Sequence, residues 1–338
     1  MQSFTADKVT DYSLWKTTKN LKRPTVHNPP IKNDNGLWAK SDADKSEVFA
    51  THLQKTFQPF DLIGDFNAPL TVQESNDIPP FSTTEIVEEI KKLKSGKSPG
   101  FDLITAQILK NLPHKALLKL NSILNACLNL KYIPLSWKVS EIIMIQKPGK
   151  NANEVKSYQP ISLLPVMGKL FEKLFSRRLK EVIAIKQLVP SHQFGFREKH
   201  STIDQVHRIV HTIEETLEKK KVCSAIFLDV AQAFDKVWHK GLDYKLKTQL
   251  PIQYTDILKS YMNDRYFRVK HDQAYSNLQK IEAGVPQGSI LGPILYLLYT
   301  ADIPLPINSK IATFADDTCI LSTGNDEIES TRKLQAVL

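Results

Sequence analysis

The sequence predicts an α+β fold from three observations. Patterns typical of helices and of strands alternate irregularly along the 338 residues, whereas a doubly wound parallel sheet needs a regular alternation. Two apolar runs, at 311–314 and 318–321, flank a short turn and predict a strand–turn–strand unit. With 41% hydrophobic and 24% charged residues, the chain has enough core material for two globular domains or one large composite domain.

Composition excludes several classes of protein. With only 12 glycines and 3 cysteines, neither a collagen-like chain nor a disulfide scaffold is expected. Cys127, Cys223 and Cys319 lie far apart in apolar stretches, so we expect reduced core residues of an intracellular protein, in the nucleus or the cytoplasm. The chain does not begin with the apolar run of a signal peptide. The most apolar stretch, 290–299, is too short for a bilayer and predicts a buried helix, so no membrane partner is expected.

The charge balance points to a polyanionic partner. Lys and Arg together number 45 and Asp and Glu 36, which leaves a formal net charge of +9. This excess favours binding to nucleic acid, although charge alone does not distinguish a nucleic-acid enzyme from a binding protein.

Residues 1–80 are predicted to be a basic connector region. Lysines and an arginine precede several prolines between 16 and 30, and Pro79-Pro80 closes the region. One helix is expected inside it, because Val48, Phe49, Leu53 and Phe57 recur at helical spacing.

From residue 81 onward the pattern is denser in helices and strands. Thr83 or Thr84 is predicted to cap a helix that carries Ile86 and Ile90 and ends at Gly96. Further helices are expected over 117–128, ending near Pro134, and over 170–182. Another, over 203–217, has an apolar face of Ile203, Val206, Val210, Ile213 and Leu217. Predicted strands occupy 142–145, 225–228, 267–271 and 278–283, the last two as a hairpin.

Three acids stand where these strands end. Asp229 follows the apolar strand 225–228, and Asp316 and Asp317 lie at the tip of the strand–turn–strand unit. A carboxylate directly after a buried strand is costly unless it is paired or binds a cation. Three converging carboxylates could hold two magnesium ions about 3.5–4 Å apart, as in in-line phosphoryl transfer. Taken alone, an Asp-Asp pair is far more often an ordinary hairpin turn, and Asp229 a helix cap.

A second motif, GVPQGS at 284–289, precedes the predicted buried helix. Two glycines and a proline allow the backbone to approach a flat ligand closely, and Gln287 offers an amide to it. The simpler interpretation is a turn followed by a helix start.

These motifs carry a resemblance to a known family. Residues 227–239 (FLDVAQAFDKVWH) resemble the first palm motif of reverse transcriptases of non-LTR retrotransposons, in particular the jockey-like branch. Residues 284–289 are similar to the family's template- and nucleotide-contacting motif, and 314–317 (FADD) to its catalytic acid box. Residues 157–164 and 193–202 are similar to its fingers motifs. All five occur in the family's order; the resemblance covers 81–324, and 15–30 resembles the connector that follows the endonuclease.

The resemblance implies the fingers and palm of a right-hand polymerase over 81–338, with a motif-bearing core at 141–324. An antiparallel palm sheet would be backed by helices, and the chain would end before the thumb. The implied activity is RNA-directed DNA polymerisation, a nucleotidyl transfer that adds dNTPs to a primer 3′-hydroxyl. The implied partners are an RNA template, a DNA primer and dNTPs, with two Mg²⁺ ions as cofactors.

The resemblance also implies roles for individual residues. Asp229, Asp316 and Asp317 would be catalytic and bind the two metal ions, with the Val230 carbonyl as an extra ligand. Phe234 would lie under the sugar of the incoming nucleotide and exclude a 2′-hydroxyl, although its alternative role is core packing. The remaining implied contacts are Gln287 and Gly288 to the nucleotide, Lys147 to the triphosphate or the template, and Arg197 to template or phosphate. Gln159 stands at the nucleotide-binding position whose family arginine meets the nucleotide phosphates. Lys147 as a solvated loop lysine and Arg197 in a structural ion pair are the alternatives.

The sequence departs from the family pattern in three places. Gln159 stands where the family usually has an arginine, whose charge and bidentate fork glutamine cannot supply. Gln232 replaces a frequent lysine, and the sequence given stops at Leu338, before the thumb. A catalytically inactive nucleic-acid-binding remnant of such an element is therefore an alternative. A two-metal nuclease is a third candidate, against which Phe234 and the 286–288 motif argue.

Overall fold

The structure is a computed structural model that describes residues 29–33, 35–59, 77–304 and 309–336. Its described residues form a mixture of helices and sheets, so the α+β prediction is confirmed at this level. Most of the segment 15–30 lies outside the described residues.

The first described elements pack into the core of a sheet. β1 (Ile31–Lys32) pairs with β2 (Trp38–Ala39), and α2 (Asp42–Thr56) follows. The helix predicted around Phe49 and Leu53 is confirmed. It begins after Ser41, whose side chain accepts a hydrogen bond from the Asp44 amide. Phe49, Leu53 and Phe57 share one core with Ile142 and Phe267. This part of the 1–80 region is therefore packed against the motif-bearing part of the chain.

That core belongs to a five-stranded sheet with the order β4-β3-β6-β7, in which β8 also pairs with β6. Its strands are β3 (Val139–Gln146), β4 (Tyr158–Leu163), β6 (Arg265–His271), β7 (Ala274–Tyr275) and β8 (Gln279–Ile281). The 3₁₀ turns Leu135–Trp137 and Val155–Ser157 precede β3 and β4. β3 and β6 run parallel, while β6 and β8 pair antiparallel as the predicted hairpin requires.

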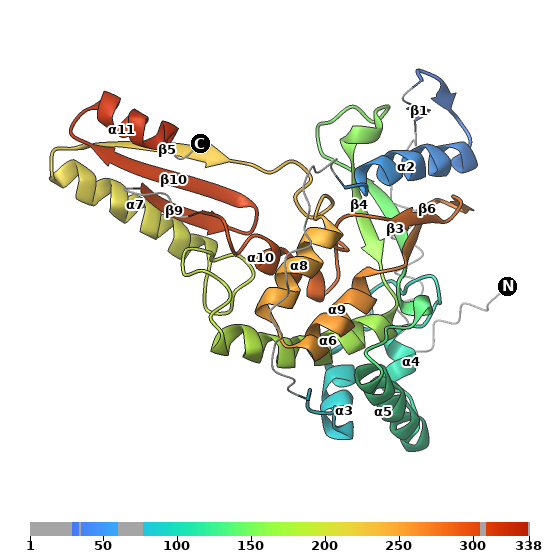
Figure 1. Ribbon diagram of the computed structural model, residues 1–338. Coiled ribbons are helices and arrows are strands. Elements are labelled where there is room, and N and C mark those ends of the chain that lie inside the picture. Colours follow the sequence, from blue (N-terminus) through green and yellow to red (C-terminus); the bar gives the residue numbers. More distant parts are fainter. Residues whose placement is uncertain (1–28, 34, 60–76, 305–308, 337–338) are drawn as a thin grey trace, which may run out of the picture.

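A layer of helices lies beside this sheet, in the lower part of Figure 1. It comprises α3 (Thr83–Lys92), α4 (Ala106–Lys110), α5 (His114–Asn129), α6 (Val166–Ile185), α8 (His239–Gln249), α9 (Ile252–Met262) and α10 (Leu291–Tyr299). Leu124, Phe171, Leu258 and Leu295 are among the residues of their common core. The prediction of a buried helix at 290–299 is confirmed by α10.

The predicted start of α3 needs a correction. Ser82, rather than Thr83 or Thr84, is the N-cap, because its hydroxyl accepts from the Glu85 amide while the Glu85 carboxylate accepts from the Ser82 amide. The helix ends at Lys92, before the predicted Gly96.

A separate three-stranded sheet carries the acids, and we call it the acidic sheet. Its order is β5-β10-β9, with β5 (Val222–Leu228), β10 (Asp317–Gly324) and β9 (Ser309–Phe314) all antiparallel. α7 (Thr202–Glu218) packs on one face through Ile209 and Ile213, and α11 (Glu327–Gln335) packs on the other through Leu334. Figure 1 shows these two helices on opposite sides of the sheet.

The predicted apolar face of α7 is buried only in part, because Ile213 packs on the sheet while its other members do not. Ile203, Val206, Val210 and Leu217 are 42–69% exposed, whereas Gln205, Thr212 and Thr216 are buried. Hydrogen bonds decide this orientation, because the Gln205 amide donates to the carbonyls of His192 and Thr313. The two threonine hydroxyls donate to helix carbonyls four residues earlier, which satisfies them inside the protein.

The expectation of a buried strand before Asp229 is also wrong in part. β5 is an edge strand, and Phe227 near its end is 74% exposed. Asp229 therefore follows a strand end that is open to solvent.

The cysteines are free, with Cys127 and Cys319 buried as expected and Cys223 half-buried. Within the ranges that the structure describes, no helix has the length and apolar character needed to cross a bilayer.

Candidate active site

The pairing of the acidic sheet brings acids from distant parts of the sequence to one end. Leu228 of β5 lies opposite Thr318 of β10, and Asp229 and Asp317 are each one residue further toward the same end of the ladder. Asp317 pairs with Phe314, which leaves Ala315 and Asp316 in the turn between β9 and β10. Asp229 and Asp317 are exposed and Asp316 is half-buried.

These three carboxylates have the properties of a site for hard cations. Among the described residues, no lysine, arginine or histidine forms an ion pair with Asp229, Asp316 or Asp317. Carboxylate oxygens together with a backbone carbonyl, such as that of Val230, are the ligands that magnesium prefers. The residues present therefore fit a magnesium site, and the excess of negative charge there is what a cation would neutralise.

The carboxylate oxygens of the three acids are not as close to one another as the ligand atoms of a single ion would be. In the part of the chain that the structure describes, Asp42, His271 and Asp272 form a group whose ligand atoms all lie within 4.8 Å, and the three acids of the sheet do not. Like charges repel, and a site for two ions about 3.5–4 Å apart spreads its ligands over a wider space. That the carboxylates of Asp229 and Asp316 are close enough to share metal ions stays a prediction.

An aromatic stack adjoins the acids. The Phe234 ring stacks on Tyr296 of α10, with ring centroids 4.4 Å apart, and meets Phe196 edge-on at 5.8 Å. Burial, and secondarily the negative charge of Asp316, raise the pKa of Tyr296 to about 12. Phe234 is half-buried, so it packs in the core and also borders the acidic end of the sheet.

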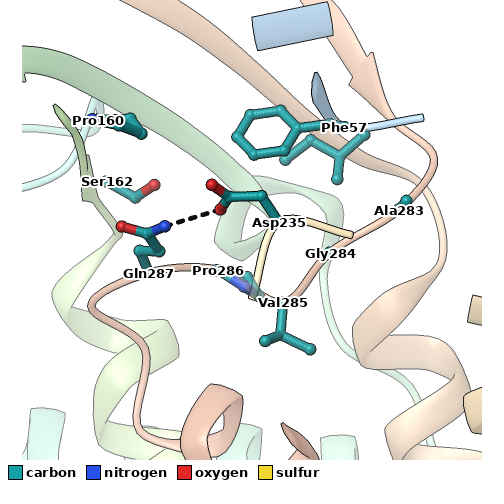
Figure 2. A pocket seen from close by; sticks show the side chains of 10 residues that line it. Phe57, Pro160, Ser162, Asp235, Ala283, Gly284, Val285, Pro286 and Gln287 are labelled. Atoms are coloured by element: carbon teal, nitrogen blue, oxygen red, sulfur yellow. Dashed lines mark hydrogen bonds between the residues drawn. The ribbon is translucent and has the colours of Figure 1, made fainter. Parts of the chain in front are cut away.

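The loop with Gln287 folds back onto the segment that follows Asp229. Figure 2 shows the Gln287 amide directed at Asp235, to which it donates a hydrogen bond of 2.8 Å. Gly284 has a φ of +90°, and a Cβ there would lie 2.6 Å from the Asp235 carbonyl oxygen, so only glycine permits this approach. Pro160 and Ser162 of β4 line the same small pocket. The Gln287 side-chain nitrogen is thus bound within the protein, while Gly288 is exposed beside it.

Asp235 is a site residue that the sequence reasoning missed. Its carboxyl is buried, and burial raises its pKa to about 6, against which the Gln287 hydrogen bond acts. The available signal was an acid six residues after Asp229, directly after the aromatic Phe234, but only the fold shows that it is buried.

Glu172 of α6 was also missed. It is fully buried, and its Oε2 accepts hydrogen bonds from the amides of Ile290 (2.7 Å) and Leu291 (3.2 Å) at the start of α10. Burial raises the pKa of this carboxyl, while these two amides and the positive charge of Arg265 act in the opposite direction. Glu172 therefore anchors the end of the 284–289 loop on the helical layer.

The predicted basic and polar contacts lie apart from the acids. Gln159 is exposed on β4 opposite Ile145, and Lys147 is exposed in the turn after β3. No described contact joins either side chain to the acidic sheet. The Arg197 guanidinium donates to the carbonyls of Pro190 (3.1 Å) and Gln193 (3.0 Å), so it stabilises its own turn. Its contact with template or phosphate stays a prediction.

Antiparallel strands that present acids at one end, next to an aromatic stack and a glycine-bordered glutamine, match the arrangement expected of a polymerase. Residues 145–338 match the family model described as reverse transcriptase (RNA-dependent DNA polymerase), so the chain belongs to the reverse transcriptase family. It is 43% identical over 321 residues to the "Probable RNA-directed DNA polymerase from transposon X-element" of Drosophila melanogaster, covering 91% of this chain and 35% of the relative. The "RNA-directed DNA polymerase from mobile element jockey" of Drosophila funebris is 40% identical over 354 residues, covering 100% of this chain and 38% of the relative.

The similarity to the jockey-like branch of non-LTR elements is thereby confirmed. A third relative, the "Probable RNA-directed DNA polymerase from transposon BS" of Drosophila melanogaster, is 42% identical over 97% of this chain. The chain spans little more than a third of the length of these relatives.

Proposed function

We propose that this chain forms the fingers and palm of an RNA-directed DNA polymerase that extends a DNA primer on an RNA template. The observation that supports the proposal is the pairing of β5 with β10, whose register ends at Leu228 and Thr318, next in sequence to Asp229 and Asp317. The acidic sheet with α7 and α11 corresponds to the palm, and the five-stranded sheet with β4 to the fingers. Residues 1–80 would be the connector that precedes them.

Asp229, Asp316 and Asp317, with the Val230 carbonyl, would hold two Mg²⁺ ions. When bound, these ions would neutralise the charge of the triphosphate and of the attacking oxygen. In the reaction, the primer 3′-oxygen forms a bond to the α-phosphorus of the dNTP while the bond to the β-phosphate oxygen breaks, which releases pyrophosphate. The protein's own residues contribute orientation and fixed charge rather than covalent chemistry.

The other residues would act on the incoming nucleotide. Phe234 is held by the Tyr296 ring, so it is a rigid surface on which a 2′-hydroxyl would clash. Gly288, with a φ of +90° and no side chain, leaves room for a base or sugar next to Gln287. Lys147 is exposed and charged, and would attract the triphosphate, whereas neutral Gln159 offers hydrogen bonds only.

Single-nucleotide addition tests the proposal, because it requires one binding event and does not require the protein to stay bound to the duplex through successive additions. With excess protein, an RNA template, a DNA primer and Mg²⁺, we expect addition of the templated dNMP. The Asp316→Asn variant should lower the rate about 100-fold or more, since it removes a ligand's charge and keeps its shape. Asp77→Asn, which changes an exposed aspartate outside both sheets, is the matched control and should add the nucleotide at the parent rate.

The results separate the polymerase from an inactive remnant. Binding of the primer–template without any addition, by the parent and by Asp77→Asn alike, contradicts the polymerase proposal for this chain. Addition by Asp316→Asn at the parent rate contradicts the assignment of the acids.

A further inference from the structure

The turn that carries Asp316 is held by a segment from elsewhere in the chain. Residues 192–194 run beside β9: the Phe194 amide donates to the Thr313 carbonyl (2.9 Å), and the Thr313 amide donates to the His192 carbonyl (3.0 Å). Gln193 and Thr313 form a parallel bridge. The outer edge of the acidic sheet is therefore closed by this segment, next to the β9–β10 turn.

The side chain of Gln193 reaches from this segment to the turn itself. Its Nε2 donates to the Ala315 carbonyl (3.1 Å), and its Oε1 accepts from the Ala315 amide (2.9 Å) and the Gly195 amide (2.8 Å). Gln193 is only 4% exposed, so water does not compete for these bonds. One buried amide thus pairs with both backbone groups of the residue directly before Asp316.

Ala315 needs such support because of its conformation. Its φ is +60°, in the left-handed region that side chains other than glycine adopt at a cost. Gly195 allows the close approach: a Cβ at this position would lie 2.1 Å from the Ala315 nitrogen. The segment 193–195 and the turn are therefore fitted to each other at backbone distance.

We propose that Gln193 is a positioning residue for the metal site. Its side-chain amide keeps Ala315 in the left-handed conformation, and this fixes the direction in which the turn presents the Asp316 carboxylate to a divalent cation. The proposal rests on the proposed function, in which Asp316 binds metal. It assigns to Gln193 a role in cation affinity that packing of the 192–194 segment alone would not give.

Gln205 provides the comparison. It is equally buried at 4% exposure, and its amide donates to His192 and Thr313 in the same ladder, but it makes no hydrogen bond to Ala315. Replacing either glutamine with methionine keeps the length of the side chain and removes its hydrogen bonds. Both variants loosen the segment, and only Gln193→Met frees the turn.

The test measures binding of Mn²⁺ alone, by electron paramagnetic resonance, and hydrogen exchange of the peptide spanning 312–318. Gln193→Met should weaken Mn²⁺ binding about 10-fold and speed exchange at the Ala315 amide, whereas Gln205→Met should weaken binding less than about 2-fold. In the Gln193→Met background, Ala315→Gly should recover most of the affinity, because glycine adopts a positive φ without strain. Unchanged Mn²⁺ binding in Gln193→Met, an equal loss in Gln205→Met, or no recovery with Ala315→Gly would overturn the proposal.

Thermal unfolding of each variant shows whether it is folded at the temperature of the measurement. If Gln193→Met is not folded, Gln193→Glu takes its place, because it keeps an acceptor for the Ala315 amide and loses the donor to the Ala315 carbonyl. It should give the same ordering relative to Gln205→Met. Asp316→Asn is the separate control for the site: if it binds Mn²⁺ as the parent does, the proposed function fails at its acids, while exchange at Ala315 still reports whether Gln193 holds the turn.

Discussion

Asp235 shows how one buried side chain links two segments of the site. Its carboxyl is buried next to the 283–287 loop and accepts a hydrogen bond from the Gln287 side-chain nitrogen, which Figure 2 shows directed at it. Because burial raises its pKa from 3.8 to about 6, ionised Asp235 is less stable in the folded protein than in the unfolded chain. The contribution of protonated Asp235 to the unfolding free energy is fully present below pH about 4. It is lost as the pH rises through about 6.

The variant Asp235→Asn should remove this pH dependence. Asparagine can still accept from Gln287 and carries no charge, so relative to the parent it should gain about 1–3 kcal/mol in unfolding free energy between pH 4.5 and pH 8. Urea unfolding at both pH values measures the difference. Asp77→Asn should show a constant difference over the same interval. If the unfolding free energy of Asp235→Asn minus that of the parent stays constant or decreases toward pH 8, burial does not destabilise the ionised Asp235 carboxylate.

Gln159 gives a second prediction at this scale. It is exposed on β4, where an arginine has room to extend toward a triphosphate. A charge-assisted hydrogen bond contributes roughly 1.5–3 kcal/mol, so Gln159→Arg should lower the KM for dNTP about 10- to 150-fold with a smaller effect on kcat. Steady-state addition at varied dNTP concentration measures this. Lys110→Arg on α4 is a control without added charge, and an unchanged KM in Gln159→Arg would exclude position 159 from the triphosphate contact.

At the scale of single residues, the acids of the site were predictable and their support was not. Asp229, Asp316 and Asp317 stand at strand ends, where the pattern of apolar runs marks them. Asp235, Glu172 and Gln193 become significant only through tertiary contacts with segments 49 to 122 positions away. Such contacts include the Gly284 backbone over Asp235 and the Ala315 peptide against Gln193, and no local pattern encodes them.

At the scale of elements, α3 is held to α6 by charges around a buried carboxylate. Glu89 is fully buried and forms ion pairs with Lys173 (2.7 Å), Lys92 (3.0 Å) and Arg177. Burial has the largest influence on the pKa of Glu89 and acts to raise it, but the hydrogen bonds from Lys173 and Lys92 outweigh burial, and the pKa is lowered. The contact therefore depends on Glu89 being ionised.

Glu89→Ala should destabilise the protein by about 3 kcal/mol, because it leaves a cavity and removes the partner of two α6 cations that are about one-third exposed. Chemical unfolding at pH 7 measures the loss. Glu88→Ala, an exposed neighbour on the same helix, should change the unfolding free energy by less than about 0.5 kcal/mol. Similar losses in the two variants would mean that the ion pairs of Glu89 do not dock α3 on α6.

The elements also show where periodicity fails as a guide. Spacing predicts the existence of α2, α6 and α7, but of the apolar face that it assigns to α7 only Ile213 packs on the sheet. Hydrogen bonds from Gln205 to His192 and Thr313 fix the rotation of α7, and they outweigh the burial of Ile203, Val206 and Val210. For β5, the apolar run correctly predicts a strand. It does not predict how exposed the strand is, because a run of apolar residues does not reveal whether the strand lies at the edge of its sheet.

At the scale of the whole molecule, the architecture combines a net positive charge with a local concentration of acids. The chain carries 45 basic against 36 acidic residues, yet the end of the acidic sheet gathers Asp229, Asp316 and Asp317 without described ion pairs. Phosphates of a bound template–primer would meet the basic surface elsewhere, while the acids bind cations. If the proposed function is right, long-range attraction to nucleic acid and local metal binding would be carried by different parts of the molecule.

This separation predicts that the affinity for nucleic acid falls steeply as salt rises, and that the three acids do not contribute to this salt dependence. Fluorescence anisotropy of a labelled RNA–DNA duplex should show affinity falling about 1000-fold between about 50 and 200 mM salt if about six phosphates are contacted.

Lys147→Gln should weaken binding and reduce the slope of log affinity against log salt by about 1, since one phosphate contact is lost. Lys110→Gln, on α4 among the helices at the far side from the acidic sheet in Figure 1, should leave the slope unchanged. Asp316→Asn should also keep the slope, because it changes a metal ligand and no phosphate contact. Binding that does not respond to salt, or a slope altered equally by Lys147→Gln and Lys110→Gln, would show that the duplex does not follow the exposed turn after β3.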